Sequence, residues 1–323
     1  MRKIWLLGAV VVAGFSLVAV FPGRYPAAEA IGPAVGDPVI AAAGDIACNE
    51  SPGANQRAGD ADDYSPDGCQ MTRTVAVLKA RRLAAILPLG DEQYPSGSAG
   101  AFESSYAKTW GTDRAPVHPV PGNHEYGTPH AAGYYGYFKA AAGDPAKGYY
   151  SWSLGSWHFI AINANCGEVG SCRAGSAEER WLKADLAAHP AACTVAYWHQ
   201  PRFSSGPHHS DAHYQPFWND LYAAGADIVL NGHDHDYERF APQTPTGVAD
   251  PAHGIREFVV GTGGKSHYRF GKVEPNSAVR NGRSFGVLEI TLHRAGYDWK
   301  FVPATGTFTD SGSSRCHRRP ARA

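Results

Sequence analysis

Short apolar runs recur along the first two thirds of the chain, and most of them end at a glycine followed by a polar residue. Residues 39–43 lead into Gly44-Asp45, and residues 85–89 lead into Gly90-Asp91. Apolar runs of this length, bounded by turn-forming residues, are typical of buried β-strands. Three further runs of the same kind lie at residues 117–121, 194–198 and 226–230. The pattern therefore predicts several strands that each end in a polar side chain.

Segments with helical periodicity or helix-capping signals separate these strands. The clearest covers residues 176–188, where Ser176 and Glu179 form a capping box. Proline cannot donate to a central ladder, so we expect the second strand to end at Leu87, before Pro88. The other expected elements are helices at 72–82, 102–110, 134–142 and 214–224, a hairpin formed by 148–154 and 157–163, and strands at 255–260, 284–293 and 297–302.

This order of elements predicts an α/β fold built from two packed, mixed sheets with helices outside, that is, a four-layer α/β/β/α sandwich. Alternating strands and helices come first, and strands without intervening helices follow. We expect one catalytic domain over residues 37–303. Residues 304–323 are polar and are expected to form a loose C-terminal tail that Cys316 could tie down.

The polar residues at the ends of the five apolar runs are potential metal ligands. In open α/β sheets, ligands bind in the crevice beyond the carboxyl ends of the strands, so these residues are expected to describe one site. The spacing of His233 and His235 lets both imidazoles converge from an extended or turning backbone. Asp, Asn, Tyr and His suit a pair of hard or borderline cations. The strands deliver Asp45, Asp91, Asn123, His199 and His233.

The first thirty residues have the layout of an export signal. A basic start, Met1-Arg2-Lys3, precedes an apolar stretch over residues 4–21, and Ala28-Glu29-Ala30 offers a small-x-small cleavage site. We expect residues 1–30 to be a signal peptide, with an uncleaved membrane anchor as the alternative, because the apolar stretch approaches spanning length. The protein is therefore expected to be secreted or extracytoplasmic.

The cysteines agree with export. Their number is six, and an even count in an exported chain indicates disulfides, although the count alone does not fix their pairing. None of them has the paired spacing of a zinc knuckle, so we expect structural thiols. Placement in loops favours the pairs Cys48–Cys69, Cys166–Cys172 and Cys193–Cys316.

Composition limits the class of partner. The chain has 323 residues, 43% of them hydrophobic and 18% charged, which suits a globular protein. Its formal net charge is −1, so we expect no nucleic-acid partner attracted by bulk electrostatics. We expect no stable membrane partner unless the N-terminal segment is retained.

Five ordered motifs together resemble the calcineurin-like metallophosphoesterases, and more narrowly the purple acid phosphatase branch. They are Gly44-Asp45, Gly90-Asp91-x-x-Tyr94, Gly122-Asn123-His124-Glu125, His199 and Gly232-His233-x-His235. The broader superfamily has Asp-x-His as its first motif, and that histidine is absent after Asp45. Tyr94 occupies the place of its replacement in the purple branch. Ala47 departs from the glycine usual in that branch, which we expect to affect loop packing more than chemistry.

The resemblance implies a dinuclear metal site. By position, Asp45, Asp91, Tyr94 and His235 would hold Fe(III), because a phenolate is a hard donor suited to a ferric ion. Asp91, Asn123, His199 and His233 would hold Fe(II), Zn or Mn, with Asp91 bridging. A carboxylate is the natural bridge between two cations that repel each other.

The implied activity is hydrolysis of a small phosphate ester, most simply a phosphomonoester, by in-line attack of a metal-bound hydroxide on phosphorus. His124, next to the ligand Asn123, is the candidate proton donor to the leaving alkoxide. Asp91 and His124 are thus the expected catalytic residues. By the same resemblance, Asn123, His124, His208 and His209 would contact substrate, with exposed loop histidines as the alternative for the last two.

Two other functions remain open at this stage. One is a phosphodiesterase or nuclease on the same scaffold, and the other is a non-catalytic phosphate- or metal-binding protein. Residues 261–266 end like a phosphate-binding P-loop but lack its first glycine and a following helix, so they are interpreted as a turn at a strand end. Glu125 is expected to orient its neighbours, and Asp234 to pack and pair, with a place at the rim of the site as the alternative. Histidines outside the motifs, His158 among them, are expected to be structural or at the surface.

Overall fold

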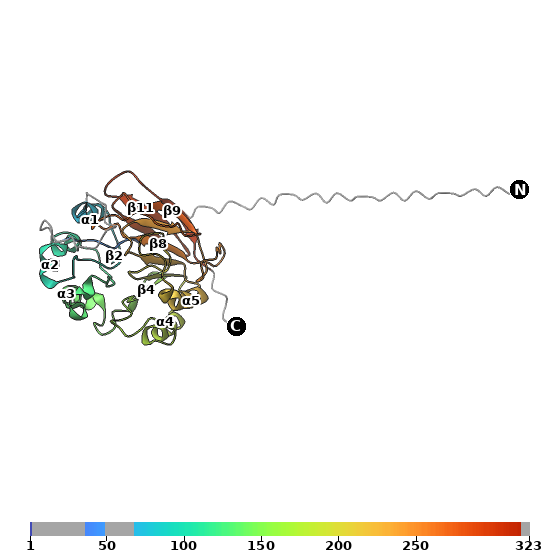
Figure 1. Ribbon diagram of the computed structural model, residues 1–323, viewed down its shortest axis with the longest axis horizontal. Helices are drawn as coiled ribbons and strands as arrows, with labels where there is room; N and C mark the ends of the chain where they lie inside the picture. The colour runs from blue at the N-terminus through green and yellow to red at the C-terminus, as the bar shows by residue number, and fades with distance from the viewer. Residues whose placement is uncertain (2–35, 49–67, 318–323) are drawn as a thin grey trace. The chain divides into compact units, whose positions relative to one another are not determined.

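Two mixed β-sheets form the centre of the molecule. The computed structural model describes Met1, residues 36–48 and residues 68–317 (Figure 1). The helices and strands of the described residues lie between Val39 and Arg315. The five-stranded sheet has the order β12 (Ser311–Arg315), β11 (Gly296–Pro303), β10 (Gly286–His293), β1 (Val39–Ala43) and β2 (Ala85–Pro88). The seven-stranded sheet has the order β3 (Tyr150–Leu154), β4 (Trp157–Ala161), β5 (Cys193–Tyr197), β6 (Ile228–Asn231), β8 (Arg256–Val260), β7 (Tyr237–Phe240) and β9 (Ser277–Asn281).

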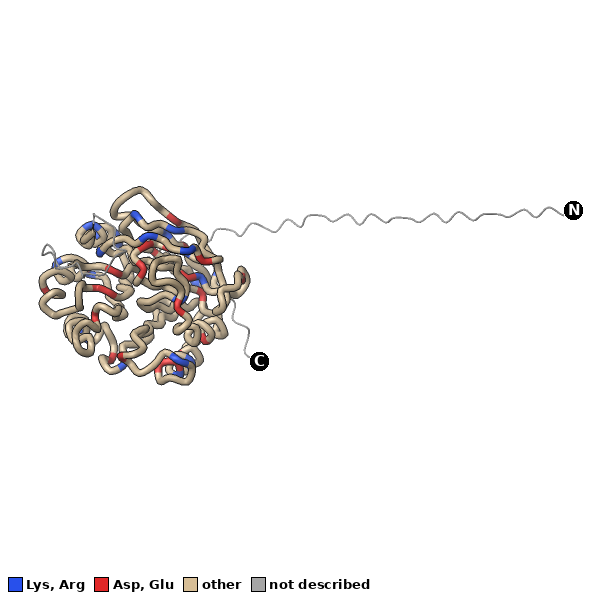
Figure 2. Tube along the Cα trace, viewed as in Figure 1, with Lys and Arg blue, Asp and Glu red and all other residues tan. Residues whose placement is uncertain are grey.

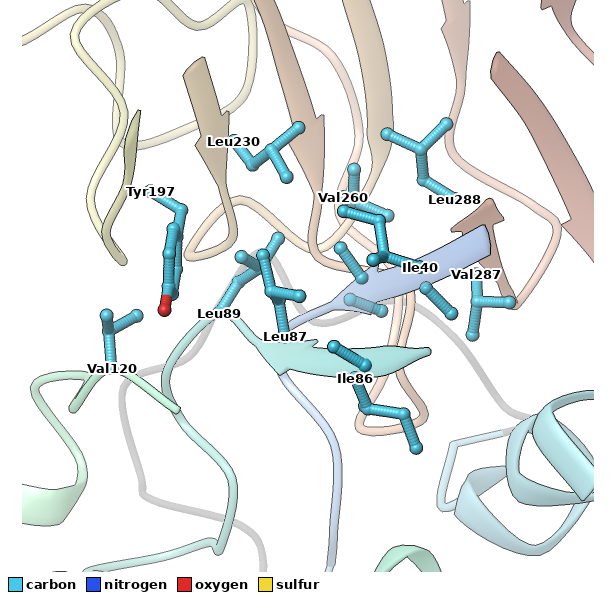
Figure 3. Packing of buried hydrophobic residues seen from close by; sticks show 14 of the residues in the cluster. Ile40, Ile86, Leu87, Leu89, Val120, Tyr197, Leu230, Val260, Val287 and Leu288 are labelled. Carbon is cyan, nitrogen blue, oxygen red and sulfur yellow. The ribbon is translucent and has the colours of Figure 1, made fainter. Parts of the chain in front are cut away.

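Alternate residues of the central strands enter two different cores. In β6, Ile228 and Leu230 belong to the core between the sheets, whereas Val229 belongs to a second core on the outer face. Strands β4, β5, β6 and β8 are parallel neighbours and are mostly buried on both faces, which explains why apolar residues in them are consecutive rather than alternating with polar ones. Figure 3 shows Leu230 on the side of Leu87 of β2, and Val260 beside Ile40 of β1.

Helices cover the outer faces of the sheets. The helices are α1 (Met71–Lys79), α2 (Ala99–Ser104), α3 (Ala132–Phe138), α4 (Ala177–Ala188) and α5 (Gln215–Ala223). α1 contacts β10 and β11, and Leu182 of α4 and Trp218 of α5 pack into the outer core of the seven-stranded sheet. The four-layer expectation is confirmed. Short 3₁₀ segments lie at Tyr106–Lys108, Trp110–Thr112, Glu125–Gly127, Pro129–Ala131, Lys139–Ala142 and Ala212–Tyr214.

Most of the expected elements form, with bounds shifted by a few residues. The Ser176 hydroxyl caps α4 by accepting a hydrogen bond from the Glu179 amide at 3.1 Å, while the Glu179 carboxylate accepts one from Gly175 rather than from Ser176. The expected helix over 102–110 is instead α2 followed by two 3₁₀ turns. Pro88 lies inside β2, contrary to expectation. β2 is an edge strand of its sheet, where a missing N–H is tolerated.

The expected strand over residues 117–121 does not form. This segment runs beside β2 and is held by three backbone hydrogen bonds, from Ile86 to Pro116, from His118 to Ile86 and from Val120 to Pro88. Only the bridge between Ile86 and Val117 qualifies as pairing. The next step of a parallel ladder would need an N–H at residue 88 to donate to the His118 carbonyl, and Pro88 has none, so the segment is extended without becoming a strand.

Three strands were not expected from the sequence: β7, β9 and β12. β12 corrects the interpretation of residues from 304 onward as a loose tail, because Ser311–Arg315 pairs antiparallel with β11. Its composition, Ser-Gly-Ser-Ser-Arg, has no apolar alternation that could have indicated a strand. Cys316, directly after it, is bonded to Cys193. The pairs Cys48–Cys69 and Cys166–Cys172 also form as expected.

The expected signal peptide, residues 1–30, and most of the loop between Cys48 and Cys69 lie outside the described residues. Within the part of the chain that is described, no helix has the length and apolar character needed to span a membrane. Figure 2 shows acidic and basic residues interspersed along the described chain, in line with the near-zero net charge.

Candidate metal centre

The candidate ligands come together where strands of both sheets end. Asp45 follows β1 and Asp91 follows β2 in the five-stranded sheet. In the seven-stranded sheet, His199 follows β5, and His233 and His235 lie between β6 and β7. The two sheets therefore deliver carboxylates from one side and imidazoles from the other.

Three of these residues have a left-handed backbone, which is unusual for residues other than glycine. The φ angles are 60° at Asp45, 48° at Asp91 and 72° at His233. Such conformations cost roughly 1–3 kcal/mol each and persist where the surrounding structure enforces them, often at functional sites. Each residue follows a glycine. At Gly90, φ is +88°, and a Cβ atom would lie 2.5 Å from Nδ1 of His199, so a side chain there would displace this candidate ligand.

The Tyr94 phenol lies at the centre of the first half of the site. Its oxygen is 2.9 Å from Asp45 Oδ1, 3.0 Å from Asp91 Oδ2 and 3.0 Å from His235 Nε2. Burial, with Asp45 and Asp91 nearby, raises the pKa of Tyr94 well above its ordinary value. A phenol has a single proton, so it cannot donate to all three of these atoms at once. A cation bound between the oxygen and nitrogen atoms would hold the same arrangement together.

The second half of the site contains Asp91, His199 and His233. His199 Nε2 lies 3.2 Å from Asp91 Oδ2 and 3.2 Å from His233 Nδ1. The potential ligand atoms of the three residues all lie within 4.8 Å of one another. Asp91 thus contacts both halves of the site, as a bridging carboxylate must.

Hydrogen bonds behind the ligands set which atoms face the centre. His199 Nδ1 lies 2.8 Å from the Leu89 carbonyl oxygen, and His235 Nδ1 lies 2.8 Å from Ser266 Oγ. Both rings therefore present Nε2 to the site, which is how outer partners orient metal-binding histidines. Glu125 is fully buried and accepts hydrogen bonds from the amides of Asp91 at 2.9 Å and Gly122 at 2.8 Å.

Charge in the centre is distributed unevenly over its buried groups. Burial by itself would raise the pKa of Asp91, but His199 and His124 lower it far below its ordinary value. Burial would lower the pKa of His199, yet Asp91 raises it to about 9. Burial and the neighbouring His199 lower the pKa of His233 to about 3. Metal binding requires an ionised carboxylate and a neutral imidazole, so Asp91 and His233 already have the binding form, whereas His199 must release a proton when a metal binds.

Asn123 is the one candidate ligand whose side chain is exposed. The loop around it is nevertheless fixed to the site, because the amide of the next residue, His124, donates to Asp91 Oδ1 at 2.9 Å. His124 lies beside the centre. Its Nδ1 is 2.7 Å from the Pro95 carbonyl oxygen, its Nε2 is 3.8 Å from Asp91 Oδ2, and its ring centroid is 4.3 Å from that of Tyr94.

The two adjacent loop histidines are placed differently. The ring of His208 packs at a centroid distance of 4.1 Å on the ring of His233, and its Nδ1 lies 2.8 Å from Asp234 Oδ1. Asp234 is fully buried, so it orients a histidine at the rim as well as packing. His209 is exposed, and its amide donates to Gly206 at 3.2 Å. Both histidines are exposed, but the structure packs the ring of His208 on the candidate ligand His233, whereas the hydrogen bond of His209 to Gly206 is made by its backbone amide.

Sequence reasoning missed the loop after β8. Ser266 supports His235, the Tyr268 ring stacks on the His235 ring at a centroid distance of 3.9 Å, and Lys265 Nζ lies 5.3 Å from the Tyr94 ring centroid. β8 is parallel to β6 and next to it, so its carboxyl end opens at the same edge of the sheet. The order of the strands would have indicated that this loop lies at the site, but the sequence does not give that order.

Comparisons with known proteins show which family the chain resembles. Residues 39–237 match the family model for the calcineurin-like phosphoesterases. Purple acid phosphatase 15 of Arabidopsis thaliana is 36% identical over 104 residues, covering 30% of this chain and 19% of the relative. Purple acid phosphatase 18 of the same plant is 29% identical over 163 residues, covering 47% of this chain and 35% of the relative. The alignments thus span about a third or less of the length of these relatives.

Solved structures share the fold at low sequence identity. The purple acid phosphatase PPD1 from yellow lupin (Lupinus luteus) seeds gives a TM-score of 0.72 at 18% identity, covering 87% of this chain and 54% of the other. A dimetal phosphatase from Danio rerio gives 0.62 at 14% identity, with 86% and 99% covered. GAP50, described as an anchor in the inner membrane complex of Plasmodium, gives 0.62 at 15% identity, with 88% and 90% covered. Because the family model covers more than half of the chain, this protein belongs to the calcineurin-like phosphoesterase family.

Proposed function

We propose that this protein is a dinuclear-metal phosphoesterase that hydrolyses small phosphomonoesters. One observation carries the proposal: six of the seven candidate ligands from separate parts of the chain converge on one buried centre, with Asp91 in contact with both halves. Maintaining three of these residues in a left-handed backbone is costly, and a fold does so where function requires it.

The donor atoms fit two different cations. Asp45, Asp91, Tyr94 and His235 offer two carboxylates, a phenol oxygen and one imidazole, a hard set suited to Fe(III). The other set has more nitrogen and suits Fe(II), Zn or Mn; it consists of Asp91, Asn123, His199 and His233. Two metal ions bound here would supply Lewis acidity and activate water for attack on phosphorus.

The residues around the metals have separate tasks in this proposal. His124 donates its Nδ1 proton to the Pro95 carbonyl, which turns Nε2 toward the centre and places it to pass a proton to the departing alkoxide. Asn123, exposed beside it, is available to contact both metal and substrate. His208, held by Asp234 against His233, lies where it can bind a phosphate oxygen. His209 has a weaker claim than His208, because it is His208 whose ring packs on the candidate ligand His233.

Export is proposed on independent grounds. The structure contains three disulfides, which persist in oxidising compartments. With the expected signal at residues 1–30, this supports a secreted or extracytoplasmic enzyme whose catalytic domain spans residues 37–303. The pairing of β12 with β11 extends the ordered fold to Arg315.

The activity is tested with two substrates and two treatments. We expect the purified protein to hydrolyse p-nitrophenyl phosphate faster than bis-p-nitrophenyl phosphate, and chelation or reduction to abolish the reaction. Oxidised, metal-replete protein should show a broad visible band from Tyr94 bound to Fe(III). His213→Ala is a matched control, because this histidine is 79% exposed and outside the centre.

Each contrary result has a distinct meaning. Faster cleavage of the diester would favour a phosphodiesterase on the same scaffold. Bound metal with no turnover of any phosphate ester would favour a non-catalytic protein, a possibility kept open by the structural likeness to GAP50, described as an anchor. Absence of the visible band in metal-replete protein would remove Tyr94 from the ligand set.

A further inference from the structure

A second group of potential metal ligands lies between the β3–β4 hairpin and helix α4. It consists of His158, Asp185 and His189, whose ligand atoms all lie within 4.8 Å of one another. We call it the His–Asp–His cluster. His158 is paired with Thr194 near the start of β5, whereas His199 follows the end of that strand. The cluster is therefore separate from the candidate metal centre.

The Asp185 carboxylate lies between the two imidazoles of the cluster. Its Oδ2 is 2.7 Å from His158 Nε2, and its Oδ1 is 3.0 Å from His189 Nδ1. Asp185 and His189 are four residues apart at the end of α4, a spacing that places both on one face of the helix. His158 faces them from β4. The three ligands thus come from two elements that already pack together.

Neighbouring serines fix the orientation of two of the three ligands. Ser151 Oγ donates to Asp185 Oδ1 at 2.6 Å. Ser153, the cross-strand partner of His158, has its Oγ 3.4 Å from His158 Nδ1, which leaves Nε2 directed at the carboxylate. Outer hydrogen bonds of this kind orient metal-binding histidines and carboxylates in known sites, and the same arrangement occurs behind His199 and His235.

Burial and charge also suit a cation. The side chains of His158 and Asp185 are 2% and 5% exposed, whereas that of His189 is 51% exposed, so an ion could enter from solvent and keep a water ligand. Burial raises the pKa of Asp185, but the hydrogen bonds from His158 and Ser151 outweigh it, and the pKa is lowered. The carboxylate is therefore ionised at neutral pH.

We propose that the His–Asp–His cluster binds one first-row divalent ion, with Zn²⁺ as the best match, and that the ion fastens α4 to the β3–β4 hairpin. Two imidazoles and one carboxylate are a common zinc donor set, with metal–ligand distances of about 2.0–2.2 Å. Donors at that distance in tetrahedral geometry are separated by about 3.4 Å. The present separations are 2.7 Å from Oδ2 to His158 and 3.0 Å from Oδ1 to His189, so the imidazoles must move outward by a few tenths of an ångström, and the carboxylate must bind through both of its oxygens.

The competing interpretation is a hydrogen-bonded His–Asp–His network that holds the same elements together without an ion. In that case the hydrogen bonds of Asp185 with His158 and His189 hold the elements together by themselves, and Zn²⁺ does not displace their protons. His189 Nδ1 also lies 3.0 Å from the Asp185 carbonyl oxygen, a contact that an ion would have to replace. The two interpretations differ in one measurable quantity, the number of Zn²⁺ equivalents bound.

The test compares wild type with His189→Ala in the full-length secreted protein. His189 is half exposed at the end of α4, so the variant is expected to fold. After the candidate metal centre is loaded and free metal removed, each protein is titrated with ZnCl₂ by calorimetry, and bound zinc is counted. We expect wild type to take up one equivalent more than His189→Ala, with phosphatase activity unchanged. His213→Ala, another exposed histidine next to an aspartate, serves as the control and should match wild type.

A second readout distinguishes a structural effect from metal binding. Zn²⁺ should raise the Tm of wild type and of His213→Ala, and this rise should disappear in His189→Ala. Equal zinc uptake and an equal Tm rise in wild type and His189→Ala would overturn the proposal. Because neither measurement uses substrate turnover, the result stands whether or not the protein is a phosphatase.

Discussion

The candidate metal centre and the His–Asp–His cluster use the same kinds of side chains, but the fold assembles them in different ways. The centre draws Asp45 and Asp91 from one sheet and His199, His233 and His235 from the other. The cluster draws two ligands from adjacent turns of α4 and one from the strand beneath. The first arrangement exists only when both sheets are packed together, whereas the second needs only a hairpin and one helix.

The two sites also differ in backbone strain. Three candidate ligands of the centre have a left-handed backbone, whereas φ is not positive at any of the three residues of the cluster. A site that depends on strain depends on the rest of the fold to maintain it. We therefore infer that the centre is pre-organised for chemistry, whereas the cluster is suited to fastening two elements together.

The largest expected effect comes from removing the carboxylate shared by both halves of the centre. Asp91→Ala should lower turnover of p-nitrophenyl phosphate by roughly 10³-fold or more and release both metals, because the bridge between two repelling cations is lost. Metal analysis and steady-state rates measure the effect. Zinc uptake by the His–Asp–His cluster should be unchanged in this variant. If both metals and the rate survive, Asp91 is not the bridge.

A smaller effect is expected for the histidine beside the bridge. His124→Ala should retain both metals and lower turnover by about 10²-fold or more, because the proton donor to the leaving group is removed while the ligands stay in place. His199→Ala provides the contrast, since it should deplete one metal selectively. Turnover that survives in His124→Ala would show that another group protonates the leaving alkoxide.

The smallest expected effect concerns the stability that the His–Asp–His cluster gives to the fold. In metal-free protein, Asp185→Asn should lower the free energy of unfolding by about 1–3 kcal/mol at pH 7, because a buried charged acceptor is lost. The pKa of Asp185 is lowered from 3.8 in the folded state, so its contribution is present above that value and is lost as the pH falls through the folded pKa. Urea unfolding at neutral and acidic pH measures this.

A control and a contrary outcome sharpen that measurement. Asp211→Asn removes an aspartate that is 40% exposed beside His213, and it should have little effect at either pH. If the difference between wild type and Asp185→Asn is the same at neutral and acidic pH, the carboxylate is not held ionised by His158 and Ser151. The cluster would then contribute through packing alone.

Most ligands of the candidate metal centre could be predicted from the sequence, because a local sequence pattern precedes each of them. An apolar run, a turn-forming residue and a polar residue recur at Asp45, Asp91 and His233, and parallel strands open at a common edge. The His–Asp–His cluster has no such mark. An aspartate and a histidine four residues apart are common on helices, and His158 gives no sign in the sequence that it faces them.

The sequence by itself determined the types of ligand, their order and the strands that carry them, because these depend on apolar patterning and on residues adjacent in the chain. Only the tertiary structure decided that Ser266 orients His235, that Asp234 holds His208 rather than merely packing, and that Ser311–Arg315 becomes a strand. The first two contacts join residues that are 31 and 26 positions apart, and the third joins a strand without apolar alternation to a sheet. Their formation depends on how the sheets and loops pack, and no local pattern encodes that.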